Sequence, residues 1–212
     1  MPVIKSKPYH LQTYEFLKDM ILSGKLTCGE KLNEIKLSQL LQVSRSPIRE
    51  AFRILEQDAL IVPTSSGLIV NPLTPETIHN VNESRIGLES YAARLATRHF
   101  TKQDHIILID SVEQCKKADN DNDMVQLIDL NTFFHDHIAA LTQNDFIIMQ
   151  IERIQNIVKL SRLKELQQGT RDLSYAYKDH IDIADSLLAG DEDAVETLMR
   201  KHLSNNMHSL LI

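Results

Sequence analysis

Residues 37–60 constrain the fold of this chain more than any other stretch, because two helical patterns are separated there by a short break. The leucines of the first pattern keep helical spacing, and residues 42 and 43 interrupt it. Ser46-Pro47 then predicts a second helix, with Ser46 as its N-cap and proline at its first position, that runs to about Asp58. Two short helices joined in this way are typical of a helix-turn-helix.

The second helix has two distinct flanks when its residues are placed 100° apart. The apolar flank, which is expected to pack, comprises Ile48, Ala51, Phe52 and Leu55. The adjoining flank is cationic and carries Arg45, Arg49 and Arg53.

An arginine fork can pair with a guanine edge or grip a phosphate, and helix-turn-helix proteins read bases with the first residues of this helix. We therefore expect Arg45, Ser46 and Arg49 to contact DNA in the major groove. The alternative is that the arginines only solvate a helix face, with Glu56 paired to Arg53.

Two β-prone runs, residues 60–63 and 68–70, follow this helix. Between them lies Thr64-Ser65-Ser66-Gly67, which has the composition of a hairpin turn that ends in glycine. A helix-turn-helix followed by such a hairpin predicts a winged helix.

This part of the chain resembles the GntR family of bacterial transcription regulators, because the family signature V-S-R-[ST]-P-[VI]-R-E-A appears as VSRSPIREA at residues 43–51. Ala59 replaces a usual glycine, Ser66 replaces a common wing arginine, and Ile35 replaces an arginine that some members use to contact phosphate. The resemblance also implies that Gly67 lets the wing backbone approach the minor groove. The predicted DNA-binding residues are Lys36, Ser44, Arg45, Ser46, Arg49, Arg53 and Gly67.

Charge is divided unevenly along the 212 residues. Residues 1–72 carry nine Lys and Arg against seven Asp and Glu, whereas the remainder carries 14 against 22. Phosphate contacts supply most non-specific DNA affinity, so this small positive excess favours a homodimer in which two heads share the task. The sequence has no signal-peptide pattern and no apolar run of about 18 residues, so we expect a cytoplasmic protein with no membrane partner.

A proline-rich segment that interrupts regular structure follows the second β-prone run: Asn71-Pro72-Leu73-Thr74-Pro75. We place the domain boundary there. The fold class is therefore mainly α: a winged helix-turn-helix over residues 1–72, then an all-α bundle over 73–212. Six bundle helices are predicted, at about 75–99, 102–118, 123–141, 144–166, 171–189 and 191–211.

Polar residues occupy the middle of apolar stripes on three of these helices. Asn131 and His135 lie in the third helix, His180 lies in the fifth beside Tyr177, and His202 lies in the sixth. Burying such groups without partners costs on the order of 1–3 kcal/mol each. The other bundle histidines are expected at the surface or at helix ends: His79, His99, His105, His137 and His208.

One explanation for this cluster is a transition metal such as zinc or nickel, because imidazoles and an amide oxygen can complete its ligand shell. Another is a purely structural dimerisation bundle in which each histidine is hydrogen-bonded to backbone or water. A metal-dependent hydrolase is a third, but we expect no glutamate on the buried stripes to act as its general base.

The bundle resembles the FCD effector domain of the FadR subfamily, and its six helices are similar to the VanR-like group. Many such domains hold a metal through an Asp-x-x-x-His pair and two later histidines, which match Asn131, His135, His180 and His202 in this chain. Asparagine in place of aspartate leaves the ion's charge uncompensated and also weakens its retention.

The resemblance therefore implies an anionic effector, a small carboxylate that completes the metal shell. Arg85, Tyr177 and Asn206 are the residues expected to bind it, and the alternative for Arg85 is a surface ion pair with Glu89. Taken together, the sequence predicts a DNA-binding regulator that is not an enzyme. It would act as a homodimer on a pseudo-palindromic operator, with repression relieved by the effector.

Overall fold

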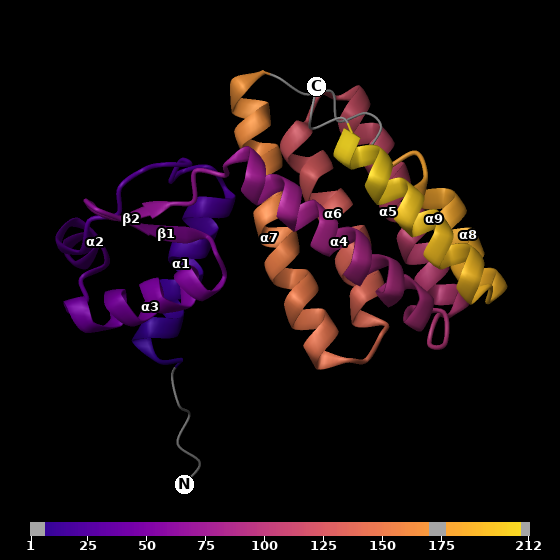
Figure 1. Cartoon of the computed structure of the whole chain (residues 1–212), viewed down its shortest axis with the longest axis horizontal. Coiled ribbons are helices and arrows are strands. Elements are labelled where there is room, and N and C mark those ends of the chain that lie inside the picture. The colour runs from indigo at the N-terminus through magenta and orange to yellow at the C-terminus, as the bar shows by residue number, and fades with distance from the viewer. Residues whose placement is uncertain (1–6, 170–176, 209–212) are drawn as a thin grey trace, which may run out of the picture. The chain divides into compact units, whose positions relative to one another are not determined.

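The computed structural model describes residues 7–169 and 177–208, except for the side chains of residues 206–208. The chain divides into two compact units, Met1–Leu73 and Thr74–Ile212 (Figure 1). No helix among the described residues is both long and apolar enough to cross a membrane.

The first unit is a winged helix-turn-helix, as the sequence predicts. It consists of α1 (Tyr9–Leu22), α2 (Glu34–Leu41), α3 (Arg45–Gln57) and the hairpin of β1 (Ile61–Thr64) and β2 (Gly67–Val70). Helix α3 packs against α1 and α2 through its predicted apolar flank. The buried residues of that flank are Ile48, Ala51, Phe52 and Leu55.

The start of α3 differs from the prediction by two residues. The helix begins at Arg45 with Ser44 as its N-cap, not at Pro47 with Ser46 as its N-cap. Pro47 is therefore the third helical residue, where its missing N–H costs nothing because the first turn has no intrahelical acceptors. As a consequence, Ser44, Arg45 and Ser46 all lie at the exposed tip of the helix.

The wing is a two-stranded antiparallel hairpin in which Ile61 pairs with Val70 and Thr64 pairs with Gly67. Ala59, just before β1, has a φ of 55°. This left-handed conformation costs an alanine about 1 kcal/mol but suits glycine. The structure thus gives a physical reason why glycine would be the easier residue at this position.

The last residues of this unit are held to the end of α3. The Asn71 side chain donates to the Ala59 carbonyl at 2.8 Å and accepts from the Leu73 backbone N–H at 2.9 Å. Leu73 is buried in turn. Thr74 is then the N-cap of the first bundle helix.

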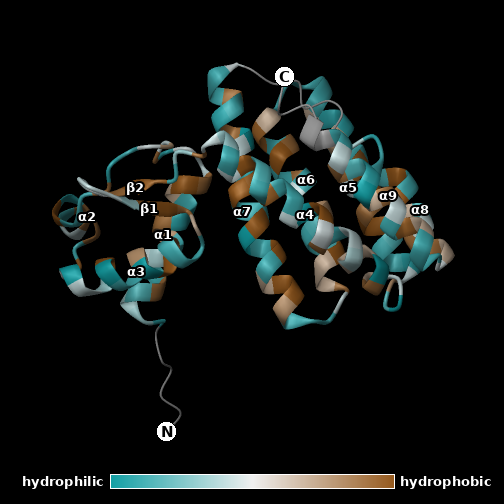
Figure 2. Ribbon diagram, viewed as in Figure 1, coloured by the Kyte–Doolittle hydropathy of each residue, from teal (hydrophilic) through white to brown (hydrophobic). Residues whose placement is uncertain are grey.

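The second unit is an all-α bundle. Its helices are α4 (Pro75–Ala96), α5 (Lys102–Asn120), α6 (Met124–Ala140), α7 (Asp145–Gln168), α8 (His180–Ala189) and α9 (Glu192–His208). Side-chain caps begin α4 to α7, and Gly169 and Gly190 end α7 and α8 in left-handed conformations. Helix α4 packs against α9, α7 and α6, while α5 packs against α6 and α8 (Figure 1). Apolar and hydrophilic residues alternate along α7 (Figure 2).

The fifth bundle helix is shorter than predicted. It was expected from residue 171, but residues 177–179 form a turn and α8 begins at His180. Residues 170–176 lie outside the described part of the chain. The expected helical stripe that joins Tyr177 to His180 is therefore wrong, although both side chains are buried.

Candidate functional site

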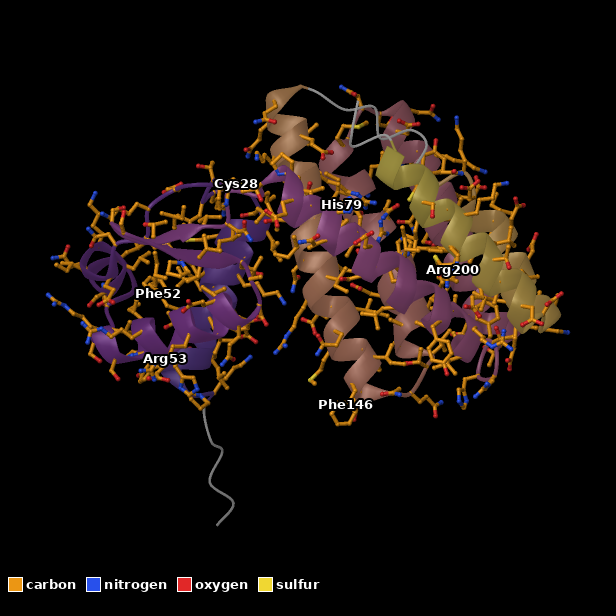
Figure 3. The ribbon with its side chains drawn as sticks, viewed as in Figure 1. Cys28, Phe52, Arg53, His79, Phe146 and Arg200 are labelled. Carbon is orange, nitrogen blue, oxygen red and sulfur yellow. The ribbon has the colours of Figure 1, made fainter. Side chains whose placement is uncertain are left out.

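The predicted DNA-reading residues form an exposed tip and flank on α3. Ser44, Arg45, Ser46, Arg49 and Arg53 are all exposed. Figure 3 shows Arg53 at the outer surface of α3, whereas Phe52 points into the unit. The amphipathic division predicted for this helix is thus present in the structure.

Two of the arginines are held by carboxylates. Arg49 Nε donates to Glu34 Oε2 of α2 at 2.9 Å, and Arg53 Nη1 donates to Glu50 Oε1 at 2.9 Å. The sequence suggested Glu56 as the partner of Arg53, but the partner is Glu50, one turn before Arg53 on α3. Glu34 was missed because the pairing joins two different helices.

The other two predicted DNA-binding residues are also exposed. Lys36 lies on α2, and Gly67 begins β2 with a φ of 120°. A Cβ at Gly67 would be strained by that φ, although its nearest neighbour would be Lys31 Cε at an ordinary 3.5 Å. Glycine is therefore required at this position by the backbone conformation.

A second cluster of predicted residues lies inside the bundle. His135 of α6, His180 of α8 and His202 of α9 are each at most 2% exposed, and each offers a ring nitrogen within 4.8 Å of those of the other two. His180 Nε2 lies 3.3 Å from His202 Nε2. The His180 ring stacks on Phe134 at a centroid distance of 3.8 Å, which fixes its orientation.

A buried polar network adjoins this histidine cluster. Arg85 Nε and Gln155 Nε2 both donate to Glu89 Oε1, at 2.8 Å and 2.7 Å. Arg85 Nη2 also lies 3.0 Å from His135 Nε2. Arg85 therefore lies beside the histidines, and its pairing with Glu89 is buried rather than at the surface.

The expectation that no glutamate shares the buried stripes is wrong. Glu89 is 3% exposed, and its Oε2 lies 2.7 Å from His135 Nδ1, although the alignment is too poor for a hydrogen bond. Its position was readable in the sequence, since Ala96, Ala93 and Ala92 continue along the same helix face to Glu89 and Arg85.

The contact with Arg85 determines where His135 carries its proton. A guanidinium only donates, so His135 Nε2 must accept with its lone pair. A neutral His135 then carries its proton on Nδ1, which faces Glu89. The carboxylate of Asp179 only accepts, and its Oδ2 lies 3.4 Å from His202 Nδ1, so His202 carries a proton on Nδ1.

All three imidazoles are held in the neutral form. Burial lowers the pKa of His135 and of His180 well below the usual value, and the cations Arg85 and Arg162 lower these pKa values further. Burial also lowers the pKa of His202, although its hydrogen bond to Asp179 acts in the opposite direction. Neutral imidazoles are the form that binds transition metals.

These pKa directions predict a loss of stability in mild acid. A histidine with a pKa below its unfolded value of about 6.5 takes up its proton only on unfolding, so stability falls as the pH falls below about 6.5. For three such groups we expect a loss of about 2–3 kcal/mol between pH 6.5 and 5.5. Urea denaturation of chelator-treated protein measures this, and an unchanged midpoint across that range would contradict it.

The matching family models cover both units. Residues 10–65 match the model of bacterial regulatory proteins of the gntR family, and residues 80–205 match the FCD domain. The chain belongs to the GntR family and carries an FCD domain.

Other GntR-family regulators are similar over most of their length. The HTH-type transcriptional regulator YdhC of Bacillus subtilis is 28% identical over 208 residues, which cover 97% of this chain and 92% of that protein. The gluconate operon transcriptional repressor of Bacillus licheniformis is 26% identical over 194 residues, which cover 90% and 78%. The structure of Escherichia coli McbR/YncC shares the fold, with a TM-score of 0.82, 23% identity and coverage of 97% and 98%.

The family and these relatives show that the chain is a DNA-binding transcription regulator and not an enzyme. The hydrolase alternative therefore falls, even though a buried carboxylate is present beside the histidines. The donor set fits a divalent transition metal, because three neutral imidazoles converge in a buried position.

The remaining predicted site residues lie as follows. Asn131 is 1% exposed, one turn before His135 on α6, and the nearby Asp129 is exposed and pairs with Lys159. Tyr177 is buried, and its hydroxyl donates to Asp119 Oδ2 at 2.8 Å. The side chain of Asn206 lies outside the described residues.

The other bundle histidines whose side chains the structure describes are not part of this cluster. His79 and His99 are exposed. His105 and His137 are only partly exposed and lie 2.7 Å and 3.0 Å from carboxylates of Asp185 and Asp104. The side chain of His208 is not described.

Proposed function

We propose that this regulator senses a small carboxylate in the histidine cluster of its FCD domain and thereby changes its affinity for an operator. The observation that carries the proposal is the convergence of three buried, neutral imidazoles beside the guanidinium of Arg85. Such a cluster is costly without a ligand, because buried polar groups need partners. Arg85 already pairs with Glu89, and its other N–H groups could donate to an anion.

In this proposal His135, His180 and His202 hold a divalent transition metal such as zinc or nickel, with the amide oxygen of Asn131 as a fourth ligand. When bound, the ion supplies a positive charge that attracts the effector's carboxylate. Asp179 orients His202 through Nδ1, whereas Glu89 faces His135 Nδ1 and its charge favours the proton on that nitrogen. Arg85 provides N–H donors for the effector, with Tyr177 and Asn206 as further contacts.

The DNA-binding side of the proposal assigns residues 1–72 to operator recognition and 73–212 to sensing and dimerisation. Arg45, Ser46 and Arg49 read bases, and Lys36, Ser44 and Arg53 contact the backbone of the duplex. Gly67 lets the wing backbone approach the minor groove. Repression relieved by the effector is the sign that we propose. It is supported by relatives that are named as repressors of a gluconate operon and, in Paenarthrobacter nicotinovorans, of a D-xylose utilization operon.

A homodimer follows from the same proposal, because two heads are needed for a pseudo-palindromic operator. We propose that α4 and α7 form its interface. A small apolar cluster lies where α4, α6 and α7 pack together, and it comprises Leu88, Ala92, Ala139, Ile147 and Ile151. The exposed apolar residues on the same two helices are Tyr91, Phe146 and Met149, of which Phe146 projects from the start of α7 (Figure 3).

Substitution at this surface is expected to weaken the dimer. Tyr91→Glu buries a charge in the interface, so the dimer dissociation constant should rise by about tenfold or more. Analytical ultracentrifugation measures it. Ile106→Glu is the control, because Ile106 is also a large exposed apolar residue, 59% exposed against 49% for Tyr91, but lies on α5. Equal effects of the two substitutions would exclude the α4 and α7 surface.

The sensing proposal is tested by calorimetric titration of a panel of small carboxylic acids into the protein, with and without a bound divalent metal. We expect at least one acid to bind more tightly when metal is present, because the ion's charge is otherwise uncompensated. Binding that is equal with and without metal would remove the metal from the proposal. The absence of any acid binding would overturn carboxylate sensing.

A further inference from the structure

The guanidinium of Arg85 and the ring of His135 meet inside the bundle, on α4 and α6. Arg85 Nη2 lies 3.0 Å from His135 Nε2, and both residues are 2% exposed. Because a guanidinium has no acceptor and keeps its protons, it engages the single lone pair of Nε2. Because His135 Nδ1 faces Glu89 Oε2 at 2.7 Å and carries the proton of the neutral ring, Nε2 is the nitrogen with the lone pair that a metal would need.

One lone pair cannot serve both partners. A metal ligand bond places the ion about 2.0–2.1 Å from the imidazole nitrogen along the direction that the lone pair takes. A guanidinium hydrogen bond occupies the same direction, and its positive charge also repels the ion. Entry of an ion therefore requires Arg85 Nη2 to leave His135.

Arg85 has a second anchor that allows this exchange. Its Nε donates to Glu89 Oε1 at 2.8 Å, and Gln155 Nε2 holds the same oxygen at 2.7 Å. The guanidinium therefore keeps a charged partner after Nη2 is released. The released N–H groups would then be available to an anion beside the ion.

We infer that Arg85 and a divalent transition metal compete for His135 Nε2, so that Arg85 sets the metal affinity of this sensor. The inference rests on the metal site of the proposed function. Asn131 increases the competition, because a neutral amide adds no negative charge to hold the ion against a neighbouring guanidinium. Loss of the Arg85 contact with His135 should therefore tighten metal binding.

The test is the Zn²⁺ affinity of full-length Arg85→Lys, measured by competition with a chelator of known affinity. The lysine ammonium takes the position of the arginine Cζ, one bond short of Nη2, so it can still pair with Glu89 but no longer lies within hydrogen-bond distance of His135 Nε2. The charge is kept and only the competing hydrogen bond is lost. We expect Zn²⁺ to bind about tenfold more tightly than to the wild type.

Two further variants make the comparison specific. Arg94→Lys is the matched control, because Arg94 lies on the same helix but pairs with Glu192, Asp193 and Glu196 of α9. It should leave the Zn²⁺ affinity unchanged. The double variant Arg85→Gln with Glu89→Gln removes both charges together, and it should also bind Zn²⁺ more tightly than the wild type. It provides the test if Arg85→Lys fails to fold.

The outcomes separate this inference from the proposed function. Equal or weaker Zn²⁺ binding by the Arg85 variants overturns the competition and leaves the metal site standing. Binding by these variants but not by the wild type supports the competition and removes the metal from the proposed function. If none of the proteins binds Zn²⁺, both are overturned.

Discussion

Glu89→Ala is expected to lower the free energy of unfolding of the bundle by about 3–5 kcal/mol, because it leaves the buried guanidinium of Arg85 without its carboxylate. Glu89 accepts from both Arg85 and Gln155, and its other oxygen faces His135. One substitution therefore removes the partner of side chains on three helices. Urea denaturation followed by far-UV circular dichroism measures the change, since the bundle supplies most of the helical signal.

Two controls identify the cause of this destabilisation. Glu113→Ala removes an exposed carboxylate that pairs with Lys116 on α5, and it should cost less than about 1 kcal/mol. The double variant Arg85→Met with Glu89→Leu removes both charges, so it should be considerably more stable than Glu89→Ala alone. A cost for Glu89→Ala no larger than that of Glu113→Ala would show that the ion pair is not buried as described.

Arg49→Ala is expected to lower the affinity for the specific operator by roughly 10- to 100-fold, the loss of one good base contact. Arg49 is exposed on α3, and its Nε donates to Glu34. This hydrogen bond orients the guanidinium and leaves its two terminal nitrogens for a base edge. Fluorescence anisotropy with an operator fragment selected from genomic DNA measures the affinity. The loss should be much smaller with scrambled DNA, because a base contact contributes little to non-specific binding.

The matched substitutions lie in the other unit. Arg98→Ala removes an arginine that pairs with Glu192, and it should leave operator affinity unchanged. His180→Ala should abolish metal binding while the effector-free protein still binds the operator, whereas Arg49→Ala should leave metal binding intact. If Arg49→Ala and His180→Ala each lose both operator binding and metal binding, the assignment of DNA reading and sensing to separate units is wrong.

The helix-turn-helix could be predicted from the sequence because its information is local. Apolar spacing, the Ser-Pro pair and the glycine-ending turn are all contained in residues 37–70. The exact start of α3 was not predicted, since serines at 44 and 46 are both acceptable caps and only the structure distinguishes them. Helix α1 was also missed, although Thr13, Leu17 and Ile21 repeat every fourth residue and are buried.

The histidine cluster could be predicted in part from helix periodicity, which correctly placed His135, His180 and His202 on buried faces. Periodicity gives only the direction of a side chain on its own helix. It does not give contacts between helices, so the pairing of Arg85 with His135, 50 residues apart, could not be predicted. Glu89 was missed for a related reason, because a charged residue is assumed to be solvated unless its partner is known.

The Asn71 side chain has a consequence for signalling. It fastens the chain to the Ala59 carbonyl and to the Leu73 backbone, and α4 begins only two residues later, at Pro75. The connection between the two units is therefore short and anchored up to Leu73. If an effector bound at Arg85 moves α4, little unanchored chain between Leu73 and Pro75 is available to absorb that movement.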